Sequence, residues 1–368
     1  MDEKRYWVGF NLVKGIGAVR LQGLRDHFGD LALAWQAPSD ALQGAGLSAK
    51  LAERVIQVRS DVNLEKLIER INRQGIKILT WDDNLYPPRL KEIDQPPPVI
   101  YVRGAIIPED TWAVAVVGTR RVTSYGRQVA EDLGSFLAAN GVTVVSGLAR
   151  GVDAIAHQSA LKAGGRTIAV LGCGVDRIYP PEHTQLAENI IASGAIISDY
   201  AIGTPPDASN FPPRNRIISG LSMATVVVEA GETSGALITA QFAVDQGREV
   251  FAVPGNILAL QSKGTNLLIA QGARPFLSVR DLLDVLNLTR VTEQRETRRI
   301  LPGDEIETKL MSVLTQEPLH MDEIQIQTGL PIERVSATLV MMELKGLVRQ
   351  VGGMNYVAIR DDQAHYKA

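Results

Sequence analysis

Apolar runs of strand length alternate with helical patterns through the middle of the chain. Between residues 112 and 286, each run is followed by a stretch long enough for a crossover, and several of these stretches have helical periodicity. The runs are WAVAVVG, VTVVSG, TIAVLG, AIISDY, ATVVVEA and EVFAVPG. This alternation is typical of a doubly wound parallel β-sheet with helices on both faces. The pattern therefore predicts an α/β, Rossmann-like core.

The pattern changes on both sides of this core. Residues 1–80 have helical periodicity interrupted by GIG and GAG turns, which predicts a helical domain of helix-hairpin-helix (SAM-like) type. A stiff, irregular, proline-rich connector is expected over 81–111. The polar segment 287–304 is expected to be a linker. Residues 305–360 predict three short helices and two strands around a Gly-Gly turn, which together make a winged helix.

Composition limits the classes of protein to which the chain can belong. Of its 368 residues, 45% are hydrophobic and 21% are charged, and the longest apolar runs are too short to cross a membrane. No apolar run of signal-peptide length opens the chain, so we expect a cytoplasmic protein without a membrane partner. The single cysteine, Cys173, excludes a multi-cysteine zinc site, and we expect neither a metal nor a cofactor. Because the net charge is −3, binding to a polyanion requires a local basic site.

The candidate chemistry lies directly after the predicted strands. Doubly wound sheets bind their ligands outside the carboxyl ends of the strands. Loop amides and helix N-termini there attract anions, and the planar fork of arginine matches phosphate oxygens. We therefore expect a phosphate-binding site composed of Gly118, Thr119, Arg120, Arg121, Ser146, Gly147, Gly151, Arg214, Asn215, Arg216, Ser234 and Gly235.

The loop after the first predicted strand indicates the kind of ligand. A dinucleotide-binding fingerprint would place further small glycines after Gly118, but Thr119, Arg120 and Arg121 stand there. Two arginines keep the backbone from approaching a ligand as closely as glycines would allow, but their long side chains bring positive charge to the ligand. A string of nucleotides fits such a site better than a single buried cofactor does.

Five motifs follow one another through the central region. They are VVGTRR…YG, VSGLARGVDAIAH, GGRTIAVLGCGVDRIYPPEH, FPPRNRIISGLS and SGALITAQFAVDQGREVFAVPG. Together they resemble the DNA-processing protein A family (DprA, also called Smf). The resemblance implies a protein without catalytic residues that binds and protects incoming single-stranded DNA. It also implies that the protein loads the RecA recombinase onto this DNA during natural transformation.

The resemblance also assigns roles along the chain. It places the family's phosphate-binding arginine at Arg120 and the basic residue of its GGKTIAV motif at Arg166, so Arg166 joins the expected DNA-binding residues. Arg214, Asn215 and Arg216 match the family's RNR segment. A homodimer is implied through the central domain, at ALITAQFAVDQGREVFAVPG.

Two other classes of function stay open. The stretch VVVEAGETSGALITA resembles the glycine loop of phosphoribohydrolases, which would make the protein a nucleotide-processing enzyme. Those enzymes need a carboxylate in the first turns of the next helix, but here no acid occurs before Asp245, and Glu229 and Glu232 precede the helix. A transcription factor that reads DNA with the winged helix is disfavoured, because residues 305–360 carry more acidic than basic side chains.

Overall fold

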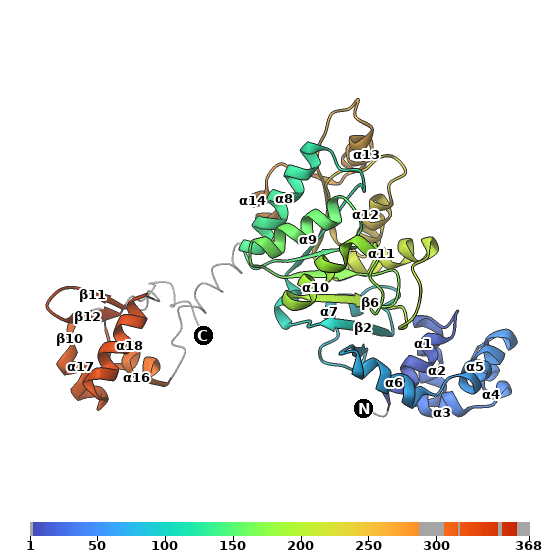
Figure 1. The fold of residues 1–368 in the computed structure, drawn as a ribbon, viewed down its shortest axis with the longest axis horizontal. Helices are drawn as coiled ribbons and strands as arrows, with labels where there is room; N and C mark the ends of the chain where they lie inside the picture. The colour runs from blue at the N-terminus through green and yellow to red at the C-terminus, as the bar shows by residue number, and fades with distance from the viewer. Residues whose placement is uncertain (1–2, 287–304, 316, 345–347, 359–368) are drawn as a thin grey trace. The chain divides into compact units, whose positions relative to one another are not determined.

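The computed structural model describes residues 3–286, 305–315, 317–344 and 348–358 (Figure 1). The chain divides into two compact units after Leu286. The linker expected over 287–304 lies outside the described residues. None of the helices in the described ranges is both long enough and apolar enough to span a membrane.

Six helices form the amino-terminal part of the first unit (Figure 1). Their aromatic residues pack edge to face: Trp7 lies 5.5 Å from Trp81, and Phe10 lies 5.0 Å from Trp35, between ring centroids. These contacts bury the apolar faces that the sequence pattern predicts. The helices are α1 (Lys4–Leu12), α2 (Ala18–Phe28), α3 (Leu31–Gln36), α4 (Ser39–Gly44), α5 (Ala49–Asp61) and α6 (Leu64–Arg73).

A nine-stranded sheet forms the centre of the first unit, in the order β1-β2-β6-β5-β4-β3-β7-β8-β9. Neighbouring strands are parallel from β6 to β9, whereas β1 and β2 are antiparallel additions at one edge. All five residues of β3 are buried, because helices cover both faces of the sheet, and such strands appear in a sequence as unbroken apolar runs. The strands are β1 (Lys77–Thr80), β2 (Val99–Gly104), β3 (Ala113–Val117), β4 (Thr143–Ser146), β5 (Thr167–Val170), β6 (Ala195–Ser198), β7 (Ala224–Val227), β8 (Glu249–Ala252) and β9 (Arg274–Pro275).

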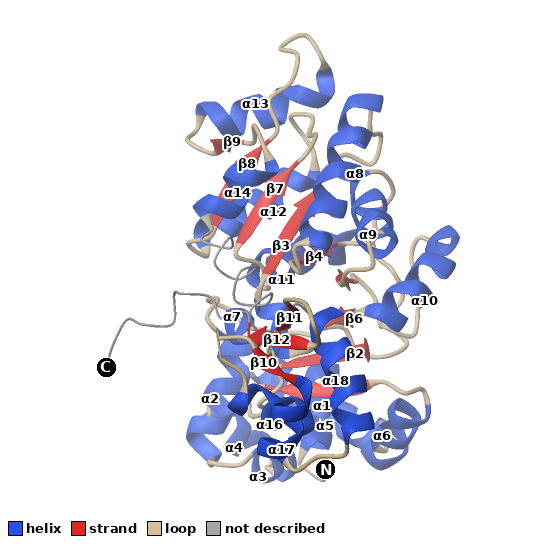
Figure 2. Ribbon diagram, turned by 90° about the vertical axis from the view of Figure 1, so that its left-hand side faces the viewer, coloured by secondary structure: helices blue, strands red, loops and turns tan. Residues whose placement is uncertain are grey.

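Helices lie on both faces of this sheet (Figure 2). α9 contacts both α8 and α10 in one layer, and α11 contacts α12 in the other. The winding reverses between the neighbouring strands β3 and β7, since the crossover from β3 leads to β4 and the crossover from β7 leads to β8. Ligands of doubly wound sheets bind at such a reversal. The helical elements are α7 (Pro88–Lys91), η1 (Pro108–Thr111), α8 (Ser124–Ala139), α9 (Val152–Lys162), η2 (Pro181–His183), α10 (Thr184–Ser193), η3 (Ala208–Asn210), α11 (Phe211–Gly220), α12 (Gly235–Asp245), η4 (Leu260–Ser262), α13 (Lys263–Ala270) and α14 (Val279–Val285).

The segment expected to be an irregular connector, 81–111, contains strand β2, and this part of the prediction is wrong. Val99–Val102 are buried, and β2 pairs with β1 on one side and β6 on the other. The prolines end just before the strand, so each strand residue keeps the amide donor that pairing needs. Residues 77–80, expected within the helical domain, form β1. The amino-terminal helices therefore share one continuous hydrophobic core with the sheet.

The second unit has the three helices and the final pair of strands predicted for a winged helix, and also a short strand, β10, that was not predicted. Its helices are α16 (Glu305–Val313), α17 (Met321–Thr328) and α18 (Ile332–Leu344), and its sheet has the order β10-β12-β11. Gly352 and Gly353 form the turn between β11 and β12 with φ of 100° and 55°, which glycine adopts without strain. Leu310, Ile324 and Leu339 lie in its buried core. The strands are β10 (Leu319–His320), β11 (Val348–Gln350) and β12 (Asn355–Ala358).

Candidate nucleic-acid interface

An open pocket of about 660 Å³ lies at the carboxyl ends of β3 and β7, where the winding of the sheet reverses. The loops after these two strands and the first turns of α11 and α12 form its wall. These segments are far apart in the sequence, and the parallel sheet brings their ends together. Eight of the predicted residues line the pocket: Gly118, Thr119, Arg120, Arg121, Arg214, Asn215, Ser234 and Gly235.

Two exposed arginines, Arg120 and Arg121, project from the loop between β3 and α8. The amide of Thr119 fixes this loop by donating to the carbonyl of Glu229 at 2.7 Å. Among the described residues, neither arginine has a carboxylate within ion-pair distance, whereas the nearby Arg150 is paired with Glu182. The two guanidinium groups are therefore available to an anion from outside the protein.

An aromatic pair that the sequence analysis missed lies beside these arginines. Tyr179, from the loop after β5, stacks on Phe211 at the start of α11, with ring centroids 5.6 Å apart and planes inclined by 29°. Both rings line the pocket, and the guanidinium of Arg120 lies 5.9 Å from the centre of the Phe211 ring. Aromatic side chains beside a positively charged groove can stack on nucleic-acid bases. The signal was present in the motifs IYPPEH and NFPPRNR, where an aromatic residue precedes two prolines.

Arg214 forms part of the floor of the pocket. Its side chain is buried and donates hydrogen bonds to the carbonyls of Gly147, at 3.1 Å, and Val170. Burial lowers the pKa of the Arg214 guanidinium, and the nearby Asp153 carboxylate opposes this effect. Burial disfavours the charged form of Asp153 too, and therefore raises the pKa of this carboxyl group. Asp153 accepts a hydrogen bond from the amide of Gly147 at 3.1 Å. Arg214 therefore joins the loops after β4 and β5 and places a positive charge beneath the exposed arginines.

Three further predicted residues support the site from outside the main pocket. The hydroxyl of Ser146 donates to the carbonyl of Val116 at 2.6 Å, which ties β4 to β3. Gly147 borders a smaller cavity that Arg120 and Arg214 also line. Gly151 has φ of 78°, and a Cβ atom there would collide with the carbonyl oxygen of Thr119, so only glycine allows the two loops to approach.

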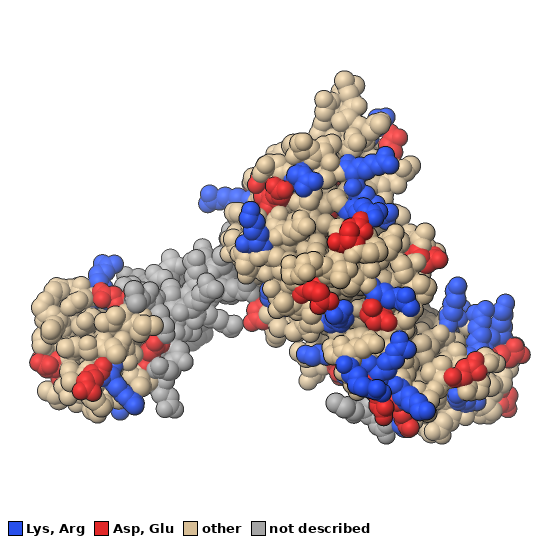
Figure 3. Space-filling model, in the orientation of Figure 1, with Lys and Arg blue, Asp and Glu red and all other residues tan. Residues whose placement is uncertain are grey.

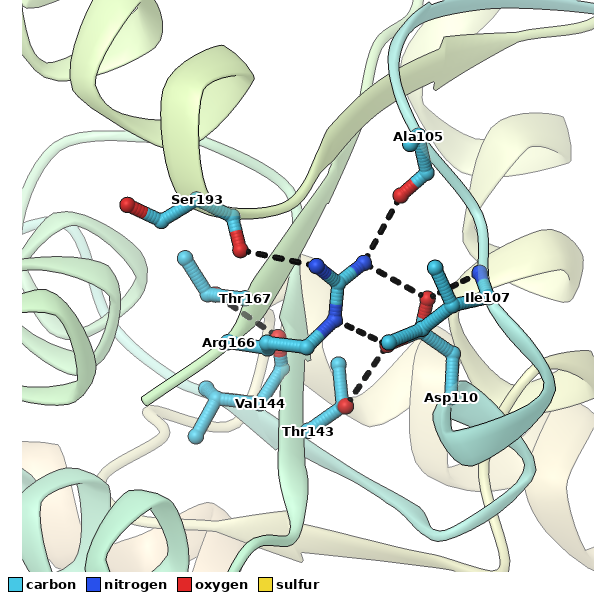
Figure 4. Close-up of polar contacts among 8 residues, drawn as sticks. All are labelled: Ala105, Ile107, Asp110, Thr143, Val144, Arg166, Thr167 and Ser193. Carbon is cyan, nitrogen blue, oxygen red and sulfur yellow. Dashed lines mark hydrogen bonds and ion pairs between the residues drawn. The ribbon is translucent and has the colours of Figure 1, made fainter. Parts of the chain in front are cut away.

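Two predicted residues lie away from the pocket, and Arg166 is the clearer case. It directly precedes β5 and therefore lies at the amino end of that strand, across the sheet from the pocket. Figure 4 shows its guanidinium donating to both carboxylate oxygens of Asp110, each at 2.9 Å, and to the carbonyls of Ala105 and Ser193. The motif fixes the position of Arg166 in the sequence. In the fold, Arg166 lies at the amino end of β5, whereas the pocket arginines lie near the carboxyl ends of the strands.

Arg216 is the second residue outside the pocket wall. It follows Arg214 by two positions on α11, so the helix directs the two side chains differently. Its guanidinium donates to the carboxylate of Asp199 at 2.8 Å, just beyond the end of β6. The side chain of Arg216 is 21% exposed, and its charge is already compensated.

The acidic residues that could suggest an enzyme have structural partners. Glu229 is 3% exposed and accepts hydrogen bonds from the amide and hydroxyl of Thr123, at 2.9 and 2.5 Å, which fixes the start of α8. Glu232 pairs with Lys263 at 3.6 Å. Within the pocket wall that the structure describes, the one carboxylate is the buried Asp153. The described ranges hold no group of three or more histidine, cysteine, aspartate or glutamate side chains suited to a metal ion.

Two family descriptions match this chain. One, DNA recombination-mediator protein A, covers residues 77–287, and the other, the DprA winged helix domain, covers residues 294–354. The chain belongs to the DprA/Smf family. These matches confirm the family that the motifs predicted, together with the α/β core and the winged helix.

Two curated Smf relatives match over nearly the full chain. Protein Smf of Synechocystis is 39% identical over 96% of this chain and 98% of the relative, and Protein Smf of Escherichia coli is 34% identical over 93% and 95%. Among solved structures, DprA of Streptococcus pneumoniae has a TM-score of 0.66 and 31% identity, covering 77% of this chain and 97% of its own. DprA of Helicobacter pylori has a TM-score of 0.52 and 32% identity over 57% and 95%, and its structure is described as showing a single-stranded DNA binding mode.

Proposed function

We propose that this DprA/Smf-family protein binds single-stranded DNA by its phosphates at the β3–β7 pocket and loads the RecA recombinase onto the bound strand in the cytoplasm. The observation that carries the proposal is the convergence of exposed arginines and stacked aromatic rings around one open pocket. Arginine neutralises phosphates without reading sequence, and an aromatic ring can stack on any base. The single-stranded DNA binding described for the H. pylori relative supports the same ligand.

Each part of the pocket has a proposed role in holding the strand. Arg120 and Arg121 contact phosphates from the exposed rim, and Arg214 contributes positive charge from below. In another part of the wall, Ser234 caps α12 by accepting from the amide of Ala236 at 3.3 Å, and the positive end of this helix borders the same pocket. Asn215 donates to the carbonyl of Gly235 at 3.3 Å and thereby connects α11 to this wall.

The binding proposal is tested by a titration of single-stranded and duplex DNA of equal length at several salt concentrations. We expect tighter binding of the single strand, no preference among sequences, and a strong salt dependence, because phosphate contacts supply the affinity. The variant Arg120→Ala should weaken binding, whereas Arg127→Ala is a control because Arg127 is paired with Glu131 on α8. Equal affinity for blunt duplex would refute the proposal.

We further propose that the protein is not an enzyme. The pocket offers no exposed carboxylate in its described wall, and Glu229 is occupied at the start of α8. No release of base from nucleoside monophosphates and no turnover of NAD should therefore be measurable. Base release that the Glu229→Gln variant abolishes would overturn this proposal.

RecA loading is proposed to require a homodimer, because two pockets hold one strand at two points and raise the effective concentration of the second contact. The segment to which the family resemblance assigns the dimer contact exposes apolar side chains: Val244 on α12 is 59% exposed. Just beyond this segment, Ile257 and Leu258 in the loop that follows β8 are also exposed. Exposed apolar residues of this kind are typical of protein interfaces.

The dimer proposal is tested with Val244→Glu, measured by light scattering and by RecA assembly on strands coated with single-strand-binding protein. We expect a monomer that binds short oligonucleotides weakly and does not stimulate assembly. Leu33→Glu on α3 is the matched control, since Leu33 is also 59% exposed. A clean monomer that stimulates RecA at the wild-type rate would contradict the proposal.

A further inference from the structure

A compact basic surface lies on the amino-terminal helices, outside the pocket. Four exposed cations lie just before the GIG turn, in the first turn of α2 and in the first two turns of α5: Lys14, Arg20, Lys50 and Arg54. We call this surface the hairpin face. Figure 3 shows lysine and arginine side chains at the upper edge of these helices and a further group of them at the left side.

Contacts within the hairpin bring these cations together. The guanidinium of Arg20 donates to the carbonyl of Gly15 at 2.6 Å, and that of Arg54 donates to the carbonyl of Lys14 at 3.1 Å. A Cβ atom on Gly15 would lie 3.0 Å from the side chain of Leu51, so the turn packs directly on α5 beside Lys50. The four charges therefore lie on one small surface rather than being spread over the domain.

The charges of the hairpin face have little local compensation. In the ranges that the structure describes, no carboxylate lies within ion-pair distance of any of the four cations; the acids that act on them from farther away are Glu53, exposed on the same helix as Arg54, and Asp207, whose pKa the charge of Lys14 helps to lower. By contrast, Arg5 pairs with Glu65 at 3.1 Å and Arg25 pairs with Asp82 at 3.1 Å in the same helical domain. An uncompensated group of cations attracts polyanions such as a phosphodiester backbone.

The hairpin face adjoins the rim of the pocket. Asn11, at the end of α1, donates to the carbonyl of Asp199 at 3.1 Å, which places the following turn at the carboxyl edge of the sheet. Hydrogen bonds from Ser209 lower the pKa of Asp207, and the charge of Lys14 adds to this lowering. Pro206 and Ala208, on either side of Asp207, line the pocket.

We propose that the hairpin face is a second phosphate-binding surface, which holds single-stranded DNA where the strand leaves the pocket; this inference rests on the proposed function. A strand that leaves the pocket beside Pro206 and Ala208 would continue toward the turn that follows α1, which the Asn11–Asp199 hydrogen bond holds at this edge of the sheet. Because one binding event then tethers the strand for the other, the second contact adds affinity for long strands and none for short ones. The cations read no bases, so the contact is independent of sequence.

The test compares oligonucleotides of about 6 and about 30 nucleotides, since single-strand sites commonly cover roughly 4–16 nucleotides. The double variant Lys14→Gln/Lys50→Gln removes two charges whose side chains hold no hydrogen bond within the described ranges. For the long oligonucleotide, the slope of log K against log salt should decrease by about 1.4, which is two phosphate contacts at about 0.7 each. Binding of the short oligonucleotide should not change. Lys66→Gln/Lys77→Gln makes the same charge change at exposed positions of α6 and β1 and should leave both lengths unaffected.

The outcomes separate this inference from the proposed function. If Arg120→Ala weakens both lengths while the hairpin variant binds the long strand with the wild-type slope, the pocket proposal stands and the hairpin inference is wrong. If Arg120→Ala changes neither length, the pocket proposal fails, whatever the hairpin variant does. If the hairpin variant loses affinity for duplex DNA alone, the face binds a different ligand and the inference is overturned.

Discussion

Replacing Arg166 with alanine should lower the stability of the first unit and leave DNA binding intact. Arg166 connects β5 to η1 through Asp110, whose side chain is only 4% exposed, and to the main chain at Ala105 and Ser193. The substitution leaves the Asp110 carboxylate buried without its counter-charge. The same change removes no group from the pocket, which lies at the opposite edge of the sheet.

The expected loss of stability depends on the hydrogen bonds that Asp110 retains in the variant. Removing one partner of a buried ion pair costs about 3–5 kcal/mol. Asp110 still accepts hydrogen bonds from the hydroxyl of Thr143, at 2.8 Å, and from the amide of Ile107, at 2.9 Å. Water can also reach the vacated space, because the side chain of Arg166 is 28% exposed. We therefore expect a loss near the lower bound, about 3 kcal/mol, or a melting temperature lowered by roughly 6–12 °C.

Thermal unfolding followed by circular dichroism, beside fluorescence anisotropy with a labelled oligonucleotide, tests this expectation. The double variant Arg166→Ala/Asp110→Ala should lose less stability than the sum of the two single variants, since they share one interaction. A wild-type melting temperature together with a reduced salt slope for DNA binding would refute the reasoning. It would show that the guanidinium of Arg166 contacts DNA, as the motif resemblance implied.

Three further predictions concern other residues. Arg120→Ala should weaken binding to all sequences alike and reduce the single-strand salt slope by about 0.7, and a loss confined to one sequence in an anisotropy titration would argue against a phosphate contact. Burial lowers the pKa of His157 to about 3, so the unfolded state binds more protons below about pH 6.5 and stability should fall as the pH is lowered from there. Urea unfolding at pH 5 and pH 7 measures this fall, and it should shrink in His157→Gln. Gly151→Ala should cost more stability than Gly164→Ala, because both have positive φ but only Gly151 would collide with Thr119; equal losses in chemical denaturation would show that the collision is relieved.

The central sheet could be predicted from the sequence because its strands are buried on both faces. Runs such as AVAVV in β3 leave no polar position to obscure the pattern. β2 could not be recognised in the same way, since its apolar residues follow three consecutive prolines and the composition of the whole segment indicated a connector. Antiparallel pairing at an edge also leaves no crossover pattern in the sequence.

The pocket could be predicted only in part. Residues that follow strands were placed correctly at one edge of the sheet, since the carboxyl ends of parallel strands meet there. The direction of each side chain is set by packing, and this separates Arg216, paired with Asp199, from Arg214 two residues earlier. Tyr179 and Phe211 lie far apart in the sequence, and only the fold brings their rings together.

The position of β1 has a consequence for any attempt to isolate the central domain. At one margin the sheet ends in β9, a two-residue strand with Pro275, which offers little backbone for another chain to pair with. At the other margin β1 occupies the hydrogen-bonding groups of β2 and is itself contacted by α1. A fragment that begins after Thr80 would therefore present Val99–Val102 as an unpaired apolar edge, open to pairing with a second fragment and to aggregation.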